Sequence, residues 1–479
     1  MTITKSFLAR RYSLILFFLV ILLSLIILLN SRYRYLNLDE FEHVHAAWYV
    51  ENNQIPYLDF FENHNPLLWY LTAPFLLILG DSTQTVIDLR LLMFVFVLGI
   101  GFFTYRVAVQ VSRSKEVAQI AVLLMFSLLL FVESAIEIRP DVPQVFFGLV
   151  SFYFLIGYFE SPRDREMIFS GLAAAAAFLF TQKMLFLIFG LGLVFIYKLF
   201  RRQISFRPIL IFLLGFSFPV ALFASGLIVS GALKDYLILG WLFNLKFITS
   251  FSPWEVLKPF FLSNILFWLI MPVSVIFILR EKRTNPGIKI VVLLGAGLFL
   301  LVFRVRHPFP QYFLPSLPFF AIAGGYFLSE GFNRFKLDNL TRVIILVLLL
   351  AEPAVFLVQK SQDQNTAQLA LINYVLRNTN EADYVYDGSL EFNLFRRDLH
   401  YFWFHNQPWG GLDQYRRLAQ NKYFGRYINP EHCRYDMCGM IKSKNPKYIL
   451  GFTYVQEKCG LPQLYESTEF AMIKIRRNN

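Results

Sequence analysis

The stretch SLILFFLVILLSLIILLN, residues 13–30, decides what kind of fold this chain can adopt. It contains no charged side chain, and as a helix it would be about as long as the hydrocarbon core of a bilayer is thick. Arg10 and Arg11 precede it, and no small-residue cleavage site follows it. We therefore predict an uncleaved signal anchor that leaves the N-terminus in the cytoplasm.

The composition extends this prediction to the rest of the chain. Of the 479 residues, 56% are hydrophobic and only 16% are charged, whereas soluble domains average about 45–50% and about 25%. Further apolar blocks lie near 86–107, 116–133, 142–159, 166–181, 184–200, 208–230, 262–280, 288–304, 309–328 and 341–358. We predict a polytopic α-helical membrane protein with about eleven spans.

The basic residues give the orientation of these spans. They concentrate in alternate loops, at 106–115, 163–165, 198–207, 280–289 and 334–342. The positive-inside rule makes these loops cytoplasmic, and an odd number of spans then places the C-terminus outside. Because the charges lie between spans, the net charge of +12 does not indicate nucleic acid as a partner.

Two domains are predicted, a membrane domain of residues 1–359 and a polar tail of residues 360–479. The first outer loop, residues 31–85, belongs to the membrane domain, and we expect its helices to lie at the membrane interface. Its apolar piece 67–79 is too short to span and contains Pro74. The tail has helical spacing over 366–377 and strand-like runs at 383–388, 446–455 and 469–477, which predicts a small extracytoplasmic α/β domain.

The three cysteines of the chain, Cys433, Cys438 and Cys459, all lie in this tail. In an oxidising compartment two of them can form a disulfide and leave one free, and the sequence does not say which two. A zinc knuckle is the alternative, although a second cysteine pair is missing.

The outer loop opens with NLDEFEHVH, residues 37–45, which carries three carboxylates and two imidazoles. Phe41, Val44 and Trp48 share one helical stripe, as expected of a helix lying on the membrane surface. Asn37 is a suitable N-cap, and Glu40 stands at the position of its capping-box partner. Glu40 is therefore predicted to be structural.

On another face of the same helix, Asp39, Glu42 and His43 are neighbours, because residues three and four apart lie side by side. Other ionisable residues of the predicted outer face occur in DFFENHNPL (59–67), EIRPD (137–141) and FRVRHPFPQY (303–312), with Lys183 between two apolar blocks. Ionisable groups at the bilayer edge indicate function. We interpret them as the lining of an outward-facing cavity.

At these motifs the chain resembles the GT-C glycosyltransferases. The similar branch contains the dolichyl-phosphate-mannose protein mannosyltransferases and the bacterial lipid A aminoarabinose and galacturonic acid transferases. The resemblance rests on Asp39-Glu40, on His64-Asn65-Pro66-Leu67, on EIRPD and on RHPFPQYFLPSLPFFAIAGG (306–325). It covers roughly residues 10–330, and Asn65 departs from the second proline that the family usually has there.

The resemblance implies a polyprenyl-phosphate-linked sugar as donor and an inverting transfer on the outer face of a bacterial inner membrane. Asp39 would be the general base for the acceptor hydroxyl. Arg304, Arg306 and His307 would stabilise the leaving phosphate, with Arg139 or Lys183 as helpers and Tyr312 in the same motif. Further substrate contacts are assigned to Glu42, His43, Asp59, Glu62, His64 and Asp141.

Alternatives stay open at several of these positions. Glu42, His43, His45, Glu62 and His64 could bind a divalent metal, with Glu42, His43 and His64 as the candidates, although His43 and His45 diverge on a helix. Arg304 and Arg306 could be snorkelling from a span end, and Arg139 with Asp141 could be a structural ion pair. The acceptor is an envelope glycolipid such as lipid A, a polysaccharide, or a secreted protein, as for the protein O-mannosyltransferases. A transporter or flippase of lipid-linked sugars is the rival function, but the two-half symmetry common in transporters is absent from the sequence.

Overall fold

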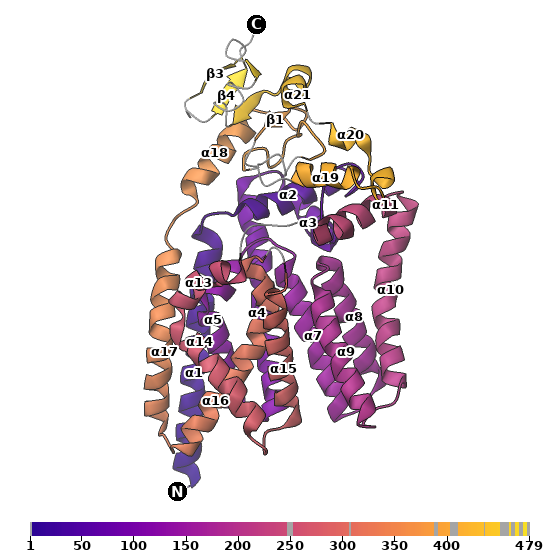
Figure 1. The fold of residues 1–479 in the computed structure, drawn as a ribbon. Helices are drawn as coiled ribbons and strands as arrows, with labels where there is room; N and C mark the ends of the chain where they lie inside the picture. The colour runs from indigo at the N-terminus through magenta and orange to yellow at the C-terminus, as the bar shows by residue number, and fades with distance from the viewer. Residues whose placement is uncertain are drawn as a thin grey trace. The chain divides into compact units, whose positions relative to one another are not determined.

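The structure is a computed structural model that describes residues 2–246, 252–305, 308–387, 391–402, 411–434, 436–450, 459–460, 465–468 and 473–476. The fold is mostly helical (Figure 1). It divides into two compact units. Unit 1 comprises Met1–Arg34, Arg90–Leu222 and Ile248–Gln362, and unit 2 comprises Tyr35–Leu89, Phe223–Phe247 and Asp363–Asn479.

Unit 1 holds the long apolar helices. They are α1 (Thr2–Tyr33), α4 (Thr83–Ser112), α5 (Lys115–Ser127), α6 (Leu129–Ala135), α7 (Asp141–Glu160), α8 (Asp164–Phe180), α9 (Met184–Phe200), α10 (Arg207–Val229), α13 (Pro253–Ser263), α14 (Ile265–Arg280), α15 (Pro286–Val302), the 3₁₀ helix η2 (Pro310–Ser316), α16 (Leu317–Arg334) and α17 (Asn339–Lys360). The first turns of α4 and the last turn of α10 belong to unit 2.

Every predicted apolar block contains a helix, but the number of spans is not thereby settled. Among the described residues, six helices are long and apolar enough to cross a membrane, or eight if each of two bent pairs is one span. Helices α8, α9 and α15 have 17 residues each. The count of eleven stays a prediction.

The two bent pairs meet at one asparagine. Helices α5 and α6 are bent by 70° at Leu128, and α13 and α14 by 108° at Asn264. The Asn264 side chain accepts the N–H of Leu129 at 3.0 Å and donates to the carbonyl of Ser127 at 3.2 Å. Broken helices are tolerated within a membrane only where other groups satisfy the freed backbone, and Asn264 does this. The break redirects the chain toward the EIRPD segment.

Close helix packing explains the alanine run of α8. Ala173, Ala174, Ala175 and Ala177 are buried. At Gly171 a Cβ atom would lie 2.2 Å from the carbonyl oxygen of Phe212, so only glycine allows α10 to approach there. The small residues of α8 thus allow close contact between helices.

Unit 2 combines the first outer loop with the tail. Its helices are α2 (Leu38–Glu51), α3 (Leu67–Leu79), α11 (Leu233–Tyr236), the π-helix η1 (Leu237–Phe243), α12 (Asn244–Lys246), α18 (Thr366–Arg377), α19 (Gly411–Ala419), the 3₁₀ helix η3 (Gly425–Tyr427), α20 (Pro430–Cys433) and α21 (Met437–Lys444). Its strands are β1 (Val385–Tyr386), β2 (Tyr448–Leu450), β3 (Tyr465–Ser467) and β4 (Ile473–Arg476). They form one sheet in the order β1-β2-β4-β3, in which β1 and β2 are parallel and the other pairs antiparallel.

The tail elements agree with the sequence at most positions. Helix α18 has the predicted bounds, and β1, β2 and β4 fall within the predicted strand runs, whereas β3 was not predicted. A disulfide joins Cys438 to Cys459 and leaves Cys433 as the free cysteine. The zinc knuckle is therefore wrong, because two of its ligands are bonded to each other.

Candidate functional site

Helix α2 begins as its sequence predicts. The backbone N–H of Asn37 donates to Oε2 of Glu40 at 2.9 Å, and the Asn37 side chain caps the first turn in return. Glu40 is fully buried, whereas Asp39 is partly exposed. Glu40 thus has the structural role predicted for it, and of this acidic pair Asp39 is the candidate for chemistry.

The interpretation of α2 as a helix on the membrane surface is wrong. Phe41, Val44 and Trp48 do form the predicted stripe, but all three are buried inside the protein. The residues of the other faces, from Glu40 to Tyr49, are buried as well. Helix α3 packs against α2, and Trp48 donates to Asp81. Sequence periodicity cannot distinguish cover by protein from cover by lipid.

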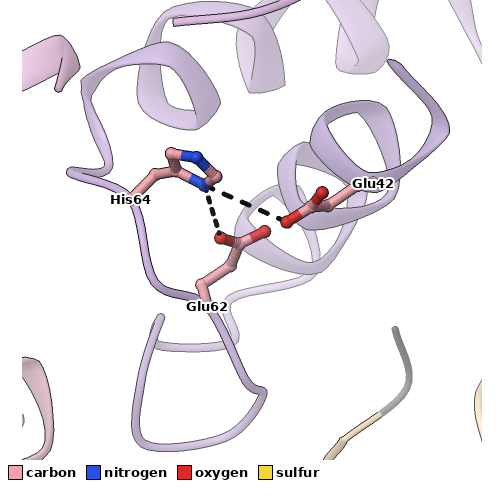
Figure 2. Close-up of side chains that lie close together, drawn as sticks. All are labelled: Glu42, Glu62 and His64. Carbon is pink, nitrogen blue, oxygen red and sulfur yellow. Dashed lines mark ion pairs between the residues drawn. The ribbon is translucent and has the colours of Figure 1, made fainter. Parts of the chain in front are cut away.

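Two carboxylates and one imidazole gather beside α2 (Figure 2). His64 Nδ1 lies 3.5 Å from Glu62 Oε2 and 3.9 Å from Glu42 Oε1. Glu42 projects from α2, and Glu62 and His64 come from the loop before α3. The Glu62 side chain is completely buried and that of Glu42 is 4% exposed. We call Glu42, Glu62 and His64 the acidic cluster.

The spacing of the acidic cluster suits a divalent cation. One ligand atom from each residue lies within 4.8 Å of the others. The two distances from His64 are too long for direct hydrogen bonds, but ligands about 2.1 Å from one ion stand roughly 3.4–4.2 Å apart. Glu62 Oε1 is buried and accepts no hydrogen bond from the described residues. A cation would satisfy this oxygen and offset the repulsion between the two carboxylates.

His43, which the sequence placed among the metal candidates, is not part of this group. Its Nδ1 accepts the indole N–H of Trp69 at 3.2 Å, and its ring packs edge-on against that of His64 with centroids 5.1 Å apart. The assignment of His43 as a ligand is therefore corrected in favour of Glu62. His43 supports the ring of His64 instead.

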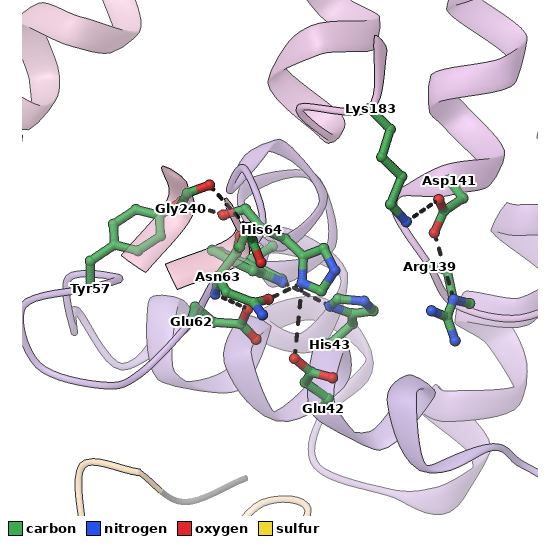
Figure 3. A network of polar contacts seen from close by, with 12 residues as sticks. Glu42, His43, Tyr57, Glu62, Asn63, His64, Arg139, Asp141, Lys183 and Gly240 are labelled. Carbon is green, nitrogen blue, oxygen red and sulfur yellow. Dashed lines mark hydrogen bonds and ion pairs between the residues drawn. The ribbon is translucent and has the colours of Figure 1, made fainter. Parts of the chain in front are cut away.

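Hydrogen bonds from distant segments hold the loop that carries Glu62 and His64 (Figure 3). The Tyr57 hydroxyl donates to the carbonyl of His64 at 2.6 Å. From the segment after α10, the Tyr236 hydroxyl donates to Asn65 at 2.9 Å, and the Asn244 amide donates to the carbonyl of Asn63 at 2.7 Å. The loop is thus fixed on more than one side, as preorganised sites require.

A second buried group around Asp398 was missed in the sequence. His45 Nε2 lies 2.5 Å from Asp398 Oδ2, to which the Tyr49 hydroxyl also donates at 2.6 Å. The other ring nitrogen of His45 lies 2.7 Å from the carbonyl of Leu394. Burial raises the pKa of the Tyr49 phenol, and the neighbouring Asp398 raises it further. His43 and His45 do diverge as predicted, and His45 ties α2 to the tail.

Two further acids of the outer loop have structural partners. Asp59 is exposed and accepts the backbone N–H of Ile55 at 2.7 Å, which closes a turn. Asp81, between α3 and α4, accepts the indole N–H of Trp48 at 3.0 Å. Burial raises the pKa of Asp81 to about 6, although this hydrogen bond acts in the opposite direction. A substrate role for Asp59 stays a prediction.

Unit 1 brings together four predicted site residues from three segments of the chain, and Figure 3 shows three of them, Arg139, Asp141 and Lys183. Lys183 Nζ donates to Asp141 Oδ1 at 2.6 Å, and Arg139 Nε lies 3.7 Å from Asp141 Oδ2. Arg139 also approaches Glu137 at 3.5 Å, and Lys183 Nζ lies 4.1 Å from the centre of the Tyr312 ring. Arg139 and Asp141 are almost fully buried. We call Arg139, Asp141, Lys183 and Tyr312 the cationic cluster.

An apolar pocket continues from the cationic cluster. Lys183 and Tyr312 line it together with Gln144, Phe186, Leu187, Leu298, Val302, Val305 and Pro315. The 3₁₀ helix η2 brings Tyr312 to this place because it packs against α6, α7 and α15. The pocket has a volume of only about 20 Å³, enough for about one water molecule, so its walls must separate before a hydrocarbon tail can enter.

The sequence analysis assigned Arg304, Arg306 and His307 to the lipid phosphate, and the structure describes one of these three residues. Arg304 follows the end of α15 and its side chain is exposed. Arg306 and His307 lie outside the described residues. Among the predicted cations, Arg139 and Lys183 are those that the structure describes in a buried cluster.

Comparison with known proteins identifies related sequences. Residues 63–229 match the family described as dolichyl-phosphate-mannose-protein mannosyltransferase. An uncharacterized protein of Aquifex aeolicus (strain VF5) is 25% identical over 322 residues, which are 62% of this chain and 59% of that protein. The chain thus aligns with less than two thirds of this relative's length.

Two kinds of solved structure resemble the fold. ArnT from Cupriavidus metallidurans bound to undecaprenyl phosphate superposes with a TM-score of 0.67 at 13% identity, over 96% of this chain and 97% of that chain. The oligosaccharyltransferase AglB from Archaeoglobus fulgidus, in complex with an inhibitory peptide and a dolichol-phosphate, gives a TM-score of 0.56 at 11% identity, over 91% of this chain and 69% of that chain. At these identities the similarity establishes a shared fold.

Proposed function

We propose that the chain is a membrane glycosyltransferase of the GT-C type that transfers a sugar from a polyprenyl-phosphate donor to a cell-envelope acceptor; the family match over residues 63–229 and the shared fold support this. The observation that carries the proposal is the buried cationic cluster, which has apolar side chains beside it. Cations bind the anionic phosphate of a polyprenyl-phosphate donor, and apolar side chains suit its hydrocarbon tail. The ArnT structure holds undecaprenyl phosphate and the AglB structure a dolichol-phosphate, which supports a donor of this class.

The proposed reaction needs a base for the acceptor. The acceptor hydroxyl oxygen attacks the anomeric carbon, its proton passes to Asp39, and the bond from the anomeric carbon to the phosphate oxygen breaks. Asp39 suits this role because it is ionisable and partly exposed, whereas its neighbour Glu40 is committed to the helix cap. Attack opposite the leaving phosphate inverts the anomeric configuration.

The leaving lipid phosphate needs cations in place of a proton donor. Lys183 and Arg139 supply them, Asp141 orients both, and Tyr312 packs on the Lys183 ammonium. Arg suits phosphate because its planar fork can make two parallel hydrogen bonds. Arg304, Arg306 and His307 remain proposed helpers at this step.

The acidic cluster is proposed to hold a divalent cation through Glu42, Glu62 and His64. Such an ion supplies charge stabilisation to phosphate or hydroxyl oxygens when bound. The buried Glu62 oxygen that accepts no hydrogen bond from the described residues supports this assignment. Asp59 is proposed to contact sugar hydroxyls from its exposed turn.

For the acceptor we favour an envelope glycolipid or polysaccharide on the extracytoplasmic face of a bacterial inner membrane, with the N-terminus in the cytoplasm. A secreted protein is the second candidate, because residues 63–229 match a family of protein mannosyltransferases. The tail from residue 360 is proposed to be an extracytoplasmic α/β domain, in keeping with its four-stranded sheet.

The test compares two adjacent carboxylates. Asp39→Asn should lower sugar transfer by about 10²-fold or more, since a positioned base contributes roughly 10²–10⁴-fold, and should leave the thermal midpoint unchanged. Glu40→Ala should retain transfer but lose about 1 kcal/mol of stability, because it breaks the helix cap. Near-normal transfer by Asp39→Asn would show that the base is assigned wrongly.

Lipid-linked sugars that co-purify with the protein, identified by mass spectrometry, would name the donor. A transporter would move such a lipid across the membrane of proteoliposomes without forming a glycosylated acceptor. That result would show that the protein is a transporter and that the proposed function is wrong.

A further inference from the structure

An apolar groove lies in unit 2 between two segments that are distant in sequence. One wall is the α11–η1 segment, with Leu233, Leu237 and Leu242, and the other is the region of η3, with Phe424 and Tyr427. The groove has a volume of about 450 Å³. Leu237 is 50% exposed and Tyr427 44% exposed, so apolar surface faces outward here. We call it the 233–427 groove.

Basic residues occur in both segments that form the 233–427 groove. Lys234 lines it, and among the described lining residues there is no acid. Lys422 and Arg426 are exposed, and each lies 4.7 Å from the ring centre of the tyrosine that follows it. Tyrosines beside lysine and arginine are typical of proteins at the lipid head-group level. The charge of the rim is complementary to a phosphate.

The groove lies beside the end of a membrane span. Helix α10, a span candidate, ends at Val229, and α11 begins at Leu233 (Figure 1). Within unit 2 the ring of Tyr236 packs against that of Phe223 in the last turns of α10, with centroids 5.3 Å apart. Four residues of chain reach at most about 14 Å. The first wall therefore begins within about 14 Å of the end of this candidate span.

The face of the α11–η1 segment that turns away from the groove packs against the first outer loop. The Tyr236 hydroxyl binds Asn65, and the Phe243 ring packs against Phe61 with centroids 5.4 Å apart. The groove is the face that this packing leaves exposed. Apolar side chains left exposed at a membrane interface gain stability from lipid contact.

We propose that the 233–427 groove binds an acyl chain of an anionic phospholipid, and that Lys234, Lys422 and Arg426 hold the phosphate of that lipid. The proposal concerns lipid binding and stands independently of sugar transfer. A cation near an anionic lipid surface favours binding about fivefold. Loss of two cations should therefore reduce the preference for an anionic over a zwitterionic lipid by about 30-fold.

The experiment is native mass spectrometry of the full-length protein released from micelles that contain equal amounts of phosphatidylglycerol and phosphatidylcholine. The wild type should retain phosphatidylglycerol selectively. Lys422→Gln with Arg426→Gln should lose the selectivity, and Leu237→Gln should lower retention of both lipids. Two controls should resemble the wild type: Leu245→Gln, which is 70% exposed in the adjoining helix α12 and does not line the groove, and Arg377→Gln with Lys442→Gln.

Equal retention of both lipids by the wild type would overturn the charge assignment and with it the proposal. Unchanged phosphatidylglycerol retention in the Leu237 and Lys422/Arg426 variants would place the lipid elsewhere. A concentration-dependent dimer mass that carries no lipid, and that Leu237→Gln abolishes, would show that a second copy covers the groove instead.

Discussion

Replacement of Lys183 by methionine separates a phosphate-binding role from a structural one. Methionine keeps most of the apolar stem and removes the ammonium, which donates to Asp141 at 2.6 Å and lies over the Tyr312 ring. If Lys183 only neutralises the buried Asp141, its loss leaves a carboxylate with Arg139 at 3.7 Å as the remaining cation of the cluster. If Lys183 binds the donor, its loss directly weakens the binding of the lipid phosphate.

The magnitude follows from the charges of the cationic cluster. A phosphate about 4 Å from an ammonium interacts by about 4 kcal/mol at an effective dielectric constant of 20. Asp141 already accepts from the same ammonium and offsets part of this attraction. Measured losses for hydrogen bonds to charged groups are about 1.5–3 kcal/mol. We therefore expect Lys183→Met to bind a polyprenyl phosphate about 10- to 150-fold more weakly.

The assay is displacement of a fluorescent polyprenyl phosphate from purified protein, with thermal stability measured in parallel. Lys198→Met is the matched control, because Lys198 stands at the opposite end of α9. The double variant Lys183→Met with Asp141→Asn decides between the roles. If restoring the charge balance in this way also restores binding to the wild-type level, Lys183 is a structural counter-ion and the phosphate assignment is wrong.

Three further predictions concern unit 2. Glu62→Gln and His64→Ala should each weaken Zn²⁺ or Mn²⁺ binding at least tenfold in calorimetric titration of chelator-treated protein, and wild-type affinity in both would refute the cation site. Asp81→Asn should stabilise the protein by about 1 kcal/mol at pH 7.5, after allowance for solvent screening. Burial raises the pKa of Asp81 to about 6, so its ionisation in the folded protein costs stability as the pH rises from about 4 through 6. The gain should vanish near pH 4 in thermal melts, and an equal gain at both pH values would exclude this cause. Replacing Cys438 and Cys459 by serine should cost about 3 kcal/mol in denaturant unfolding, given the 21-residue separation that the disulfide closes, and an unchanged midpoint would contradict it.

The sequence predicted the parts of the fold that local chemistry determines. Apolar blocks located the helices, and Asn37 with Glu40 located the start of α2 through a cap that needs only neighbours in sequence. The breaks at Leu128 and Asn264 were not predictable in the same way. No charged residue marks either break within its apolar run. The breaks are tolerated because the Asn264 side chain accepts the N–H of Leu129, which is 135 positions away in sequence.

The sequence predicted which residues belong to the candidate site, but it did not predict which of them contact one another. The titratable residues of EIRPD and Lys183 were singled out because charges at a bilayer edge are expensive, and the structure pairs Asp141 with Lys183. Asp398 was not singled out, because it lies in a polar tail where acids are common. Its partners His45 and Tyr49 lie 353 and 349 positions away, and that pairing has no local signal.

The apolar stripe of α2 was misinterpreted for the same reason, because the sequence does not show which distant residues contact it. This affects how the carboxylates of α2 are interpreted. A helix that is apolar on one side and charged on the other looks alike whether lipid or protein covers the apolar side. The structure buries both sides, so the carboxylate of Glu42 is 4% exposed and lies close to the buried Glu62. Carboxylates in water repel weakly and need no partner, but two of them removed from water need a compensating charge or a shared proton. Burial thus predicts a cation or a shared proton at the acidic cluster, where the sequence alone offered only a choice of ligands. It also separates that role from Asp39, the one carboxylate of residues 37–45 that is partly exposed.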